Sequence, residues 1–182
     1  MNKKWWSCFL ILSIILFPAL VFGCAGKWPG NSQRPDTPPD KFDQEITLYF
    51  SDDQAMYLQE EKRLVTMEKG QEAQQLPAAV INELISGPVK QNLYATIPPE
   101  TTLLGIEIKE ETAYVNFSEE LKTGHWGGST GELMTISSIV NSLTELEGIE
   151  AVIILINGET QETLAGHLDI SEPFGRFETM LK

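Results

Sequence analysis

Residues 151–156 read Ala-Val-Ile-Ile-Leu-Ile, and Asn157-Gly158 follows them directly. An apolar run this short indicates a strand whose two faces are both covered, or nearly so. Asn-Gly is a strong turn signal, because both residues tolerate left-handed backbone angles. The sequence therefore predicts that residues 151–156 form the central strand of a sheet and that the chain turns immediately after it.

Alternating apolar and polar residues predict four more strands upstream of this one. They cover residues 46–50, 63–67, 104–108 and 113–117. The short link Glu110-Glu111 predicts that the last two form a hairpin, although two glutamates fit a primed turn poorly.

The first predicted helix has Val80, Ile81 and Leu84 at helical spacing, with Pro77 in its first turn and Gly87-Pro88 after its end. A second helix has one apolar face made of Leu133, Ile136, Val140 and Leu143, and Glu147-Gly148 closes it. The segment 129–132, Ser-Thr-Gly-Glu, has the spacing of a capping box, which predicts that Ser129 caps this helix.

The order of these elements is strand, strand, helix, strand, strand, helix, strand. It predicts an α+β fold in which two helices pack on one small mixed β-sheet. Residues 161–182 are expected to form a short strand or loop and then an irregular end.

The N-terminus has the pattern of a targeting signal. Lys3 and Lys4 precede an uncharged segment, residues 5–22, as in a secretory signal or a membrane anchor. Residues 21–24, Val-Phe-Gly-Cys, resemble the bacterial lipobox. That resemblance implies a lipoprotein signal peptide over residues 1–23, diacylglycerol transfer to the Cys24 thiol and then cleavage between Gly23 and Cys24. Palmitate is among the expected acyl chains. The alternative is an uncleaved anchor with an incidental cysteine; the bulky Phe22 is unusual in a lipobox.

A tether should follow the lipidated cysteine. Residues 24–44 are rich in proline, glycine and polar residues, with little to bury. Residues 45–182 are expected to form a single domain. Under this interpretation the protein lies on the extracytoplasmic face of the bacterial cell membrane, which it meets through the lipid anchor.

The chain is acidic, with 13 Lys and Arg against 26 Asp and Glu, a formal net charge of −13. Phosphate backbones would repel such a chain, so nucleic acid is not an expected partner. Four glycines lie in residues 124–131, but no Gly-Lys-Ser or Gly-Lys-Thr follows them, so they do not form a phosphate-binding loop. No cofactor is expected.

Five segments together resemble one known family. They are residues 78–88 (AAVINELISGP), 97–101 (IPPET), 114–121 (YVNFSEEL), 148–152 (GIEAV) and 156–158 (ING). In this order and spacing they resemble the sporulation and spore germination domain, also called the GerMN domain, over about residues 46–176.

The resemblance implies a fold similar to the ring-building motifs of envelope assemblies, with no catalytic residues. It also implies a membrane-anchored protein whose partners are other envelope or sporulation proteins. The expected function is that of a non-catalytic interaction or scaffolding domain in spore formation or germination.

The histidines raise two chemical alternatives, a hydrolase with a nucleophilic serine and a metal site. His125 and Ser129 share a glycine-rich loop, but no Gly-x-Ser-x-Gly motif is present, and a helix-capping serine is not a nucleophile. His125 and His167 are the only histidines and lie far apart in the sequence, so no metal site is expected.

Trp126 is the candidate partner-binding residue. A tryptophan in a polar loop can anchor a partner, or it can fold back over the end of the core; the second reading is favoured. The alternative function is a tethered binder of a small ligand or cell-wall fragment. A pocket lined by aromatic and polar side chains would favour the binder, whereas an apolar patch or a free sheet edge would favour the scaffold.

Overall fold

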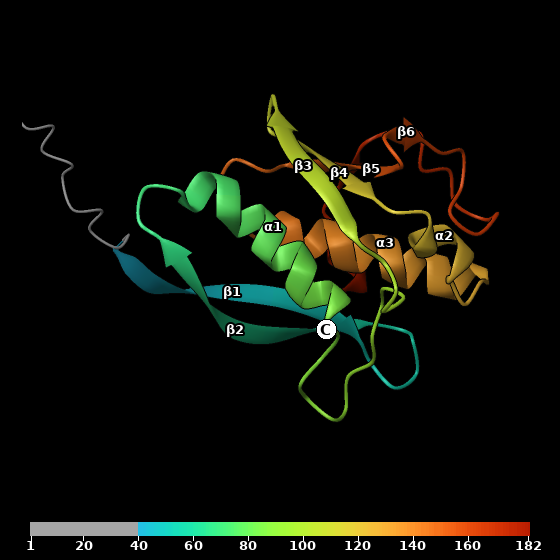
Figure 1. Cartoon of the computed structure of the whole chain (residues 1–182). Helices are drawn as coiled ribbons and strands as arrows, with labels where there is room; N and C mark the ends of the chain where they lie inside the picture. The colour runs from blue at the N-terminus through green and yellow to red at the C-terminus, as the bar shows by residue number, and fades with distance from the viewer. Residues whose placement is uncertain (1–39) are drawn as a thin grey trace, which may run out of the picture. The chain divides into compact units, whose positions relative to one another are not determined.

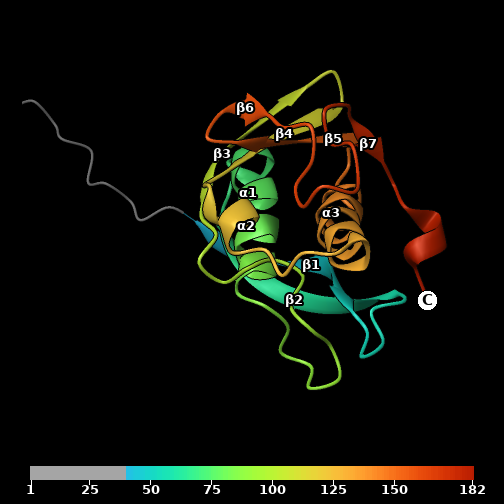
Figure 2. The ribbon, with the colours of Figure 1, turned by 90° about the vertical axis from the view of Figure 1, so that its right-hand side faces the viewer.

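Two β-sheets enclose two long helices in the structure, a computed structural model that describes residues 40–182. Figure 2 shows the layers edge on, with strands β1 and β2 on one side, helices α1 and α3 between, and strands β3 to β7 on the other. The predicted signal peptide 1–23, Cys24 and residues 25–39 of the tether lie outside the described residues. Within residues 40–182, no helix is long and apolar enough to cross a membrane.

The first sheet is a hairpin of two long antiparallel strands, β1 (Lys41–Ser51) and β2 (Leu58–Glu68). Its register runs from Lys41 opposite Glu68 to Ser51 opposite Leu58. β1 begins before Glu45, the expected start of the domain. The first residues of β1 are exposed or half-buried, so backbone pairing holds them in the strand, and the hydrophobic pattern does not mark them.

The second sheet contains the remaining strands: β3 (Leu103–Lys109), β4 (Thr112–Phe117), β5 (Ala151–Ile156), β6 (Glu159–Thr160) and β7 (Phe174–Gly175). β5 lies at its centre, parallel to β4 and antiparallel to β6 and β7. The central position predicted for residues 151–156 is therefore confirmed. The expectation of one sheet is wrong, because β1 and β2 form a sheet of their own across the helices (Figure 1).

Helix α1 (Glu72–Ile85) begins earlier than expected, so Pro77 lies inside it and not in its first turn. Its end is as predicted, since Gly87 has the left-handed φ of 80° typical of a helix C-terminus. A short helix that the sequence did not suggest, α2 (Glu120–Thr123), follows β4.

Helix α3 (Ser129–Leu143) is buried on almost every side, because sheets and helix α1 surround it. Small polar side chains let it approach β1 closely. The Tyr49 N–H donates to Ser142 Oγ at 3.0 Å, and Ser138 Oγ donates to the Tyr49 carbonyl. The helix thus satisfies backbone groups of β1 that have no strand partner there.

Both ends of α3 differ from the expectation. Gly128 occupies the N-cap, no side chain caps the helix, and Ser129 is an exposed first helical residue. The predicted capping box is therefore wrong. The helix also ends at Leu143, one turn before the expected Glu147-Gly148.

Both tight hairpins use left-handed backbone angles. Asn157 and Gly158 have φ of 51° and 84°, which confirms the predicted turn after β5. Glu110 and Glu111 join β3 to β4 with φ of 46° and 62°. The predicted hairpin is confirmed, and two glutamates adopt the conformation that usually selects asparagine and glycine.

The C-terminal segment, residues 174–182, connects the two sheets. β7 pairs with β5 in the second sheet, and Leu181 forms a bridge with Leu58 in the first. Between them, the Arg176 guanidinium lies over the Tyr49 ring and bonds to Glu145 beside α3. We call residues 174–182 the C-terminal strap. It covers a small cluster made of Tyr49, Leu58 and Met134.

Candidate functional site

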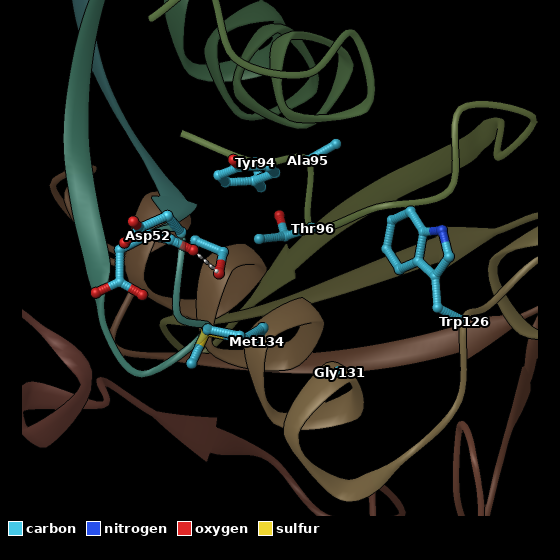
Figure 3. A pocket seen from close by; sticks show the side chains of 10 residues that line it. Asp52, Tyr94, Ala95, Thr96, Trp126, Gly131 and Met134 are labelled. Atoms are coloured by element: carbon cyan, nitrogen blue, oxygen red, sulfur yellow. Dashed lines mark hydrogen bonds between the residues drawn. The ribbon is translucent and has the colours of Figure 1, made fainter. Parts of the chain in front are cut away.

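A pocket of about 240 Å³ lies where the far end of β1 meets the N-terminus of α3. Three segments form it: the β1–β2 loop, the segment around Tyr94 and the loop that precedes α3. Figure 3 shows Asp52 on one side, Trp126 on the opposite side, and Tyr94 and Met134 between them. The full lining is Ser51, Asp52, Asp53, Ala55, Tyr94, Ala95, Thr96, Trp126, Gly131 and Met134.

The β1–β2 loop is organised by Asp52. Its Oδ1 accepts the N–H groups of Met56 at 2.9 Å and Tyr57 at 3.3 Å. The hydrogen bond from Met56 is the largest cause that lowers the Asp52 pKa, so the carboxylate is ionised at neutral pH. Ala55 has φ of 52°, a left-handed angle unusual for a residue with a Cβ. The loop therefore holds a negative charge and a strained backbone at the pocket edge.

The second segment of the pocket, around Tyr94, is hydrogen-bonded to β1 through its backbone. The Tyr94 N–H donates to the Ser51 carbonyl at 2.9 Å, and the Ser51 N–H donates back to Tyr94. Two residues further on, Thr96 Oγ1 lies 2.7 Å from Ser138 Oγ of α3. These bonds leave the Tyr94 ring free, and its side chain is largely exposed.

His125 fixes the third segment of the pocket, the loop that precedes α3. Its Nδ1 accepts the Gly127 N–H at 2.9 Å, so the proton of the neutral ring is on Nε2, which lies 3.0 Å from Thr135 Oγ1. Thr135 in turn donates to the Thr96 carbonyl. Burial is the main cause that lowers the His125 pKa. A neutral histidine therefore connects the loop before α3 to the helix and, through Thr135, to the segment around Tyr94.

Trp126 is held next to this histidine but points outward. Its ring centroid is 5.9 Å from that of His125, and the residue is 57% exposed. The favoured expectation that Trp126 covers the core is therefore wrong, because the His125 contacts orient the loop so that the indole lies at the pocket edge. Whether Trp126 binds a partner stays a prediction.

Trp126 belongs to a larger exposed group. Met56, Tyr57 and Tyr94 are also exposed large side chains, and they lie on the same three segments or next to them in sequence. We call Met56, Tyr57, Tyr94 and Trp126 the aromatic rim. Aromatic residues and methionine are enriched at protein interfaces, so this composition is typical of a contact surface.

The contacts of His125 argue against a nucleophilic Ser129. Both ring nitrogens of His125 already have partners, and Ser129 is exposed on the first turn of α3. A catalytic serine needs a base within hydrogen-bond reach. The other histidine, His167, is exposed on a separate loop. Among residues 40–182, no group of three His, Cys, Asp or Glu side chains is placed to hold a metal ion.

Glu132 has a role that the sequence did not reveal. It is fully buried, and its carboxylate accepts four backbone N–H groups, those of Leu164, Ala165, His167 and Leu168, at 2.7–3.1 Å. From the sequence, Glu132 is predicted only as part of a capping box. In the structure, its side chain binds residues 164–168, which are distant in sequence, to the first turn of α3.

A second buried carboxylate, Glu61, was also missed. It accepts the N–H groups of Val89 and Lys90 and pairs with Arg63. Arg63 also bonds to Glu83 of α1 and to the Gly87 carbonyl. Alternation along β2 marked Arg63 as a strand residue, but nothing in the local sequence indicated these partners. The network fixes the loop after α1 against β2.

The comparisons identify the family. The Germane family, described as sporulation and spore germination, matches residues 47–162, more than half of the chain. The chain belongs to this family. A comparison with curated proteins finds no match.

Solved structures show the same fold. A Clostridium perfringens protein assigned as a lipoprotein is 29% identical with a TM-score of 0.53, over 73% of this chain and 87% of the other. The first GerMN domain of the Bacillus subtilis sporulation protein GerM is 25% identical, with a TM-score of 0.54, over 73% and 98%. The tandem GerMN domains of GerM are 20% identical, with a TM-score of 0.58, over 77% of this chain and 48% of that one. The α+β GerMN fold is thereby confirmed.

Proposed function

We propose that this protein is a lipid-anchored, non-enzymatic interaction domain that acts in spore formation or germination at the bacterial cell envelope. The observation that carries the proposal is the aromatic rim: four large exposed side chains held on segments that hydrogen bonds fix to β1 and α3. A preorganised apolar surface of this kind loses little conformational entropy when it binds another protein.

The surroundings of His125 and Ser129 support a non-enzymatic protein. His125 is neutral and has partners on both nitrogens, and Ser129 lies in solvent. Family membership supports the sporulation or germination context. The partners of the domain are accordingly other envelope or sporulation proteins.

The lipid anchor rests on the lipobox at residues 21–24 and on the similar protein of Clostridium perfringens that is assigned as a lipoprotein. Cys24 would carry the acyl chains, and the domain would stand on the extracytoplasmic face of the membrane.

The test compares three variants at matched protein levels in sporulating cells. Cys24→Ala should abolish labelling by a fatty-acid analogue, release the protein from the membrane and impair sporulation or germination. The double variant Tyr94→Ala, Trp126→Ala should remain labelled and membrane-bound but lose function. Ser129→Ala should behave like the wild type. Loss of function in a folded and correctly placed Ser129→Ala protein would contradict the non-enzymatic role.

A second candidate function, a tethered binder of a small ligand or cell-wall fragment, is favoured by the pocket itself. Its lining combines aromatic, acidic and hydroxyl groups. Its volume of about 240 Å³ is below the roughly 300–1,000 Å³ usual for drug-sized ligands, which makes this the weaker candidate. Binding of muropeptides that is lost in Trp126→Ala would favour it.

A further inference from the structure

The pocket has an asymmetric chemistry. Its charged lining residues are both acidic, Asp52 and Asp53, and no lysine or arginine lines it. The rings of Tyr94 and Trp126 line the same pocket as Asp52 (Figure 3), and both residues are exposed. Carboxylates and aromatic faces both attract cations, and they attract arginine strongly, because a guanidinium stacks on rings and forms charge-assisted hydrogen bonds.

The partial positive charge at the N-terminus of α3 does not cancel the preference of the pocket for a cation. Gly131, in the first turn of α3, lines the pocket, and a helix N-terminus carries a partial positive charge. The ionisable carboxyl group of Glu132 lies in that same turn, beneath the surface, and accepts its hydrogen bonds there. A carboxylate in the first turn offsets the charge of the dipole.

The size of the pocket distinguishes a side chain from a larger ligand. A volume of about 240 Å³ is small for a metabolite, and the apolar lining of Ala55, Ala95 and Met134 suits an aliphatic stem. The exposed side chains of Tyr94 and Trp126 at the pocket provide contact area for the protein that would carry such a side chain.

We propose that this pocket receives an arginine side chain from a partner protein, with its guanidinium between the carboxylates of Asp52 and Asp53 and the rings of Tyr94 and Trp126. The inference rests on the proposed interaction role and specifies the chemistry of the contact. The overall charge of −13 agrees with it, because an acidic protein attracts a basic partner surface.

The test titrates the full chain in detergent micelles with three probes and records the tryptophan fluorescence that disappears in Trp126→Phe. The probes are the peptide acetyl-Gly-Arg-Gly-amide, the same peptide with neutral citrulline in place of arginine, and agmatine, the free guanidinium compound. The arginine peptide should give a saturable change that weakens with salt. The citrulline peptide should bind about tenfold more weakly or not at all.

Two exposed positions supply variants that keep the fold. Asp53→Asn and Tyr94→Ala should each weaken the arginine peptide about threefold, because each removes one partner of the guanidinium. Asp43→Asn is the matched control, since it removes an exposed charge near the opposite end of β1 and should change nothing.

Equal binding of the arginine and citrulline peptides would overturn the proposal, as would an unchanged affinity in both Asp53→Asn and Tyr94→Ala. Agmatine that binds more than tenfold tighter than the peptide would assign the pocket to a free small cation, which also contradicts an arginine from a protein. In the proposed function, Cys24→Ala tests the lipid anchor and Ser129→Ala tests the non-enzymatic role, and neither residue lines the pocket, so the two proposals can fail separately.

Discussion

Glu132 is the residue whose removal should damage the fold most. Its two carboxylate oxygens each accept two backbone N–H groups of residues 164–168. Glu132→Gln keeps the shape but replaces one acceptor oxygen with a donor group that faces N–H groups. We expect the free energy of unfolding to fall by about 3 kcal/mol or more, because buried donors lose a charged partner.

Urea unfolding measures this change. Glu147→Gln is the matched control, because Glu147 is exposed and its replacement should cost less than about 0.5 kcal/mol. Similar midpoints for the two variants would mean that loop 164–168 does not depend on the carboxylate.

His125 should make stability depend on pH. Burial lowers its pKa in the folded state below the ordinary value of about 6.5. Between the two values the unfolded chain binds a proton that the folded chain excludes, so the free energy of unfolding falls as pH drops below about 6.5. The decline should level off at the folded-state pKa, and above pH 7 His125 should contribute no slope.

Melting temperatures at pH 7.5, 6.5, 6.0 and 5.5 measure this slope, with pH values chosen around the ordinary histidine pKa of about 6.5. His125→Gln should flatten it, whereas His167→Gln, at the exposed histidine, should retain it. A slope that survives in His125→Gln would assign the pH dependence to another group.

At the level of elements, the β3–β4 hairpin contains strain that can be relieved. Glu110 and Glu111 hold φ of 46° and 62°, which costs residues with a Cβ about 1 kcal/mol or more each. Glu110→Asn with Glu111→Gly supplies the residues that favour this turn. We expect a gain of about 1 kcal/mol, which raises the melting temperature by about 2–4 °C.

Calorimetry on the double variant tests this expectation. Glu100→Asn is the control, because Glu100 is exposed and its φ is not positive. A melting temperature that falls in the hairpin variant would mean that the glutamate side chains, and not the turn angles, stabilise this connection.

The elements also show what the sequence could and could not predict. The apolar run 151–156 and the Asn-Gly after it identified the central strand and its turn, because side-chain pattern and turn chemistry are local. Alternation in residues 46–50 gave the buried face of β1 but not the sheet to which it belongs, since pairing with β2 alone is a tertiary property. The apolar face predicted for the second helix does not include Ser138 and Ser142, and contact with β1 explains their burial.

The candidate site was predictable only in part. Trp126 could be identified because a tryptophan in a polar loop can anchor a partner, but its exposure depends on the contacts of His125 with Thr135. Asp52 and Tyr94 were not identified. They are distant in sequence and meet only because Tyr94 pairs with Ser51 at the end of β1.

For the whole molecule, the C-terminal strap should control how firmly the two sheets are held together. It pairs with β5 through β7, bonds to Glu145 through Arg176 and reaches β2 through Leu181. It also lies beyond residue 162, where the family match ends. Deletion of residues 177–182 should lower the melting temperature and expose the cluster of Tyr49, Leu58 and Met134.

Binding of a hydrophobic dye should therefore rise in the deleted protein before it melts. Glu178→Gln, which alters only an exposed ion pair within the strap, should leave both measurements near the wild-type values. An unchanged melting temperature after the deletion would show that the two sheets are held in place without residues 177–182.

The long strand β1 has a mechanical consequence. It runs from Lys41, where the described chain begins, to Ser51 at the pocket, a span of roughly 30 Å at about 3.4 Å per residue. Tension between residue 40 and a partner held at the pocket would pass along the covalent backbone of one strand. Where the partner is held by pocket residues outside β1, such as Tyr94 and Trp126, the hydrogen bonds of β1 to its neighbours would be loaded in shear. Many bonds would then share the force, and they would not be unzipped one pair at a time. The fold is therefore suited to carry load between residue 40 and the pocket.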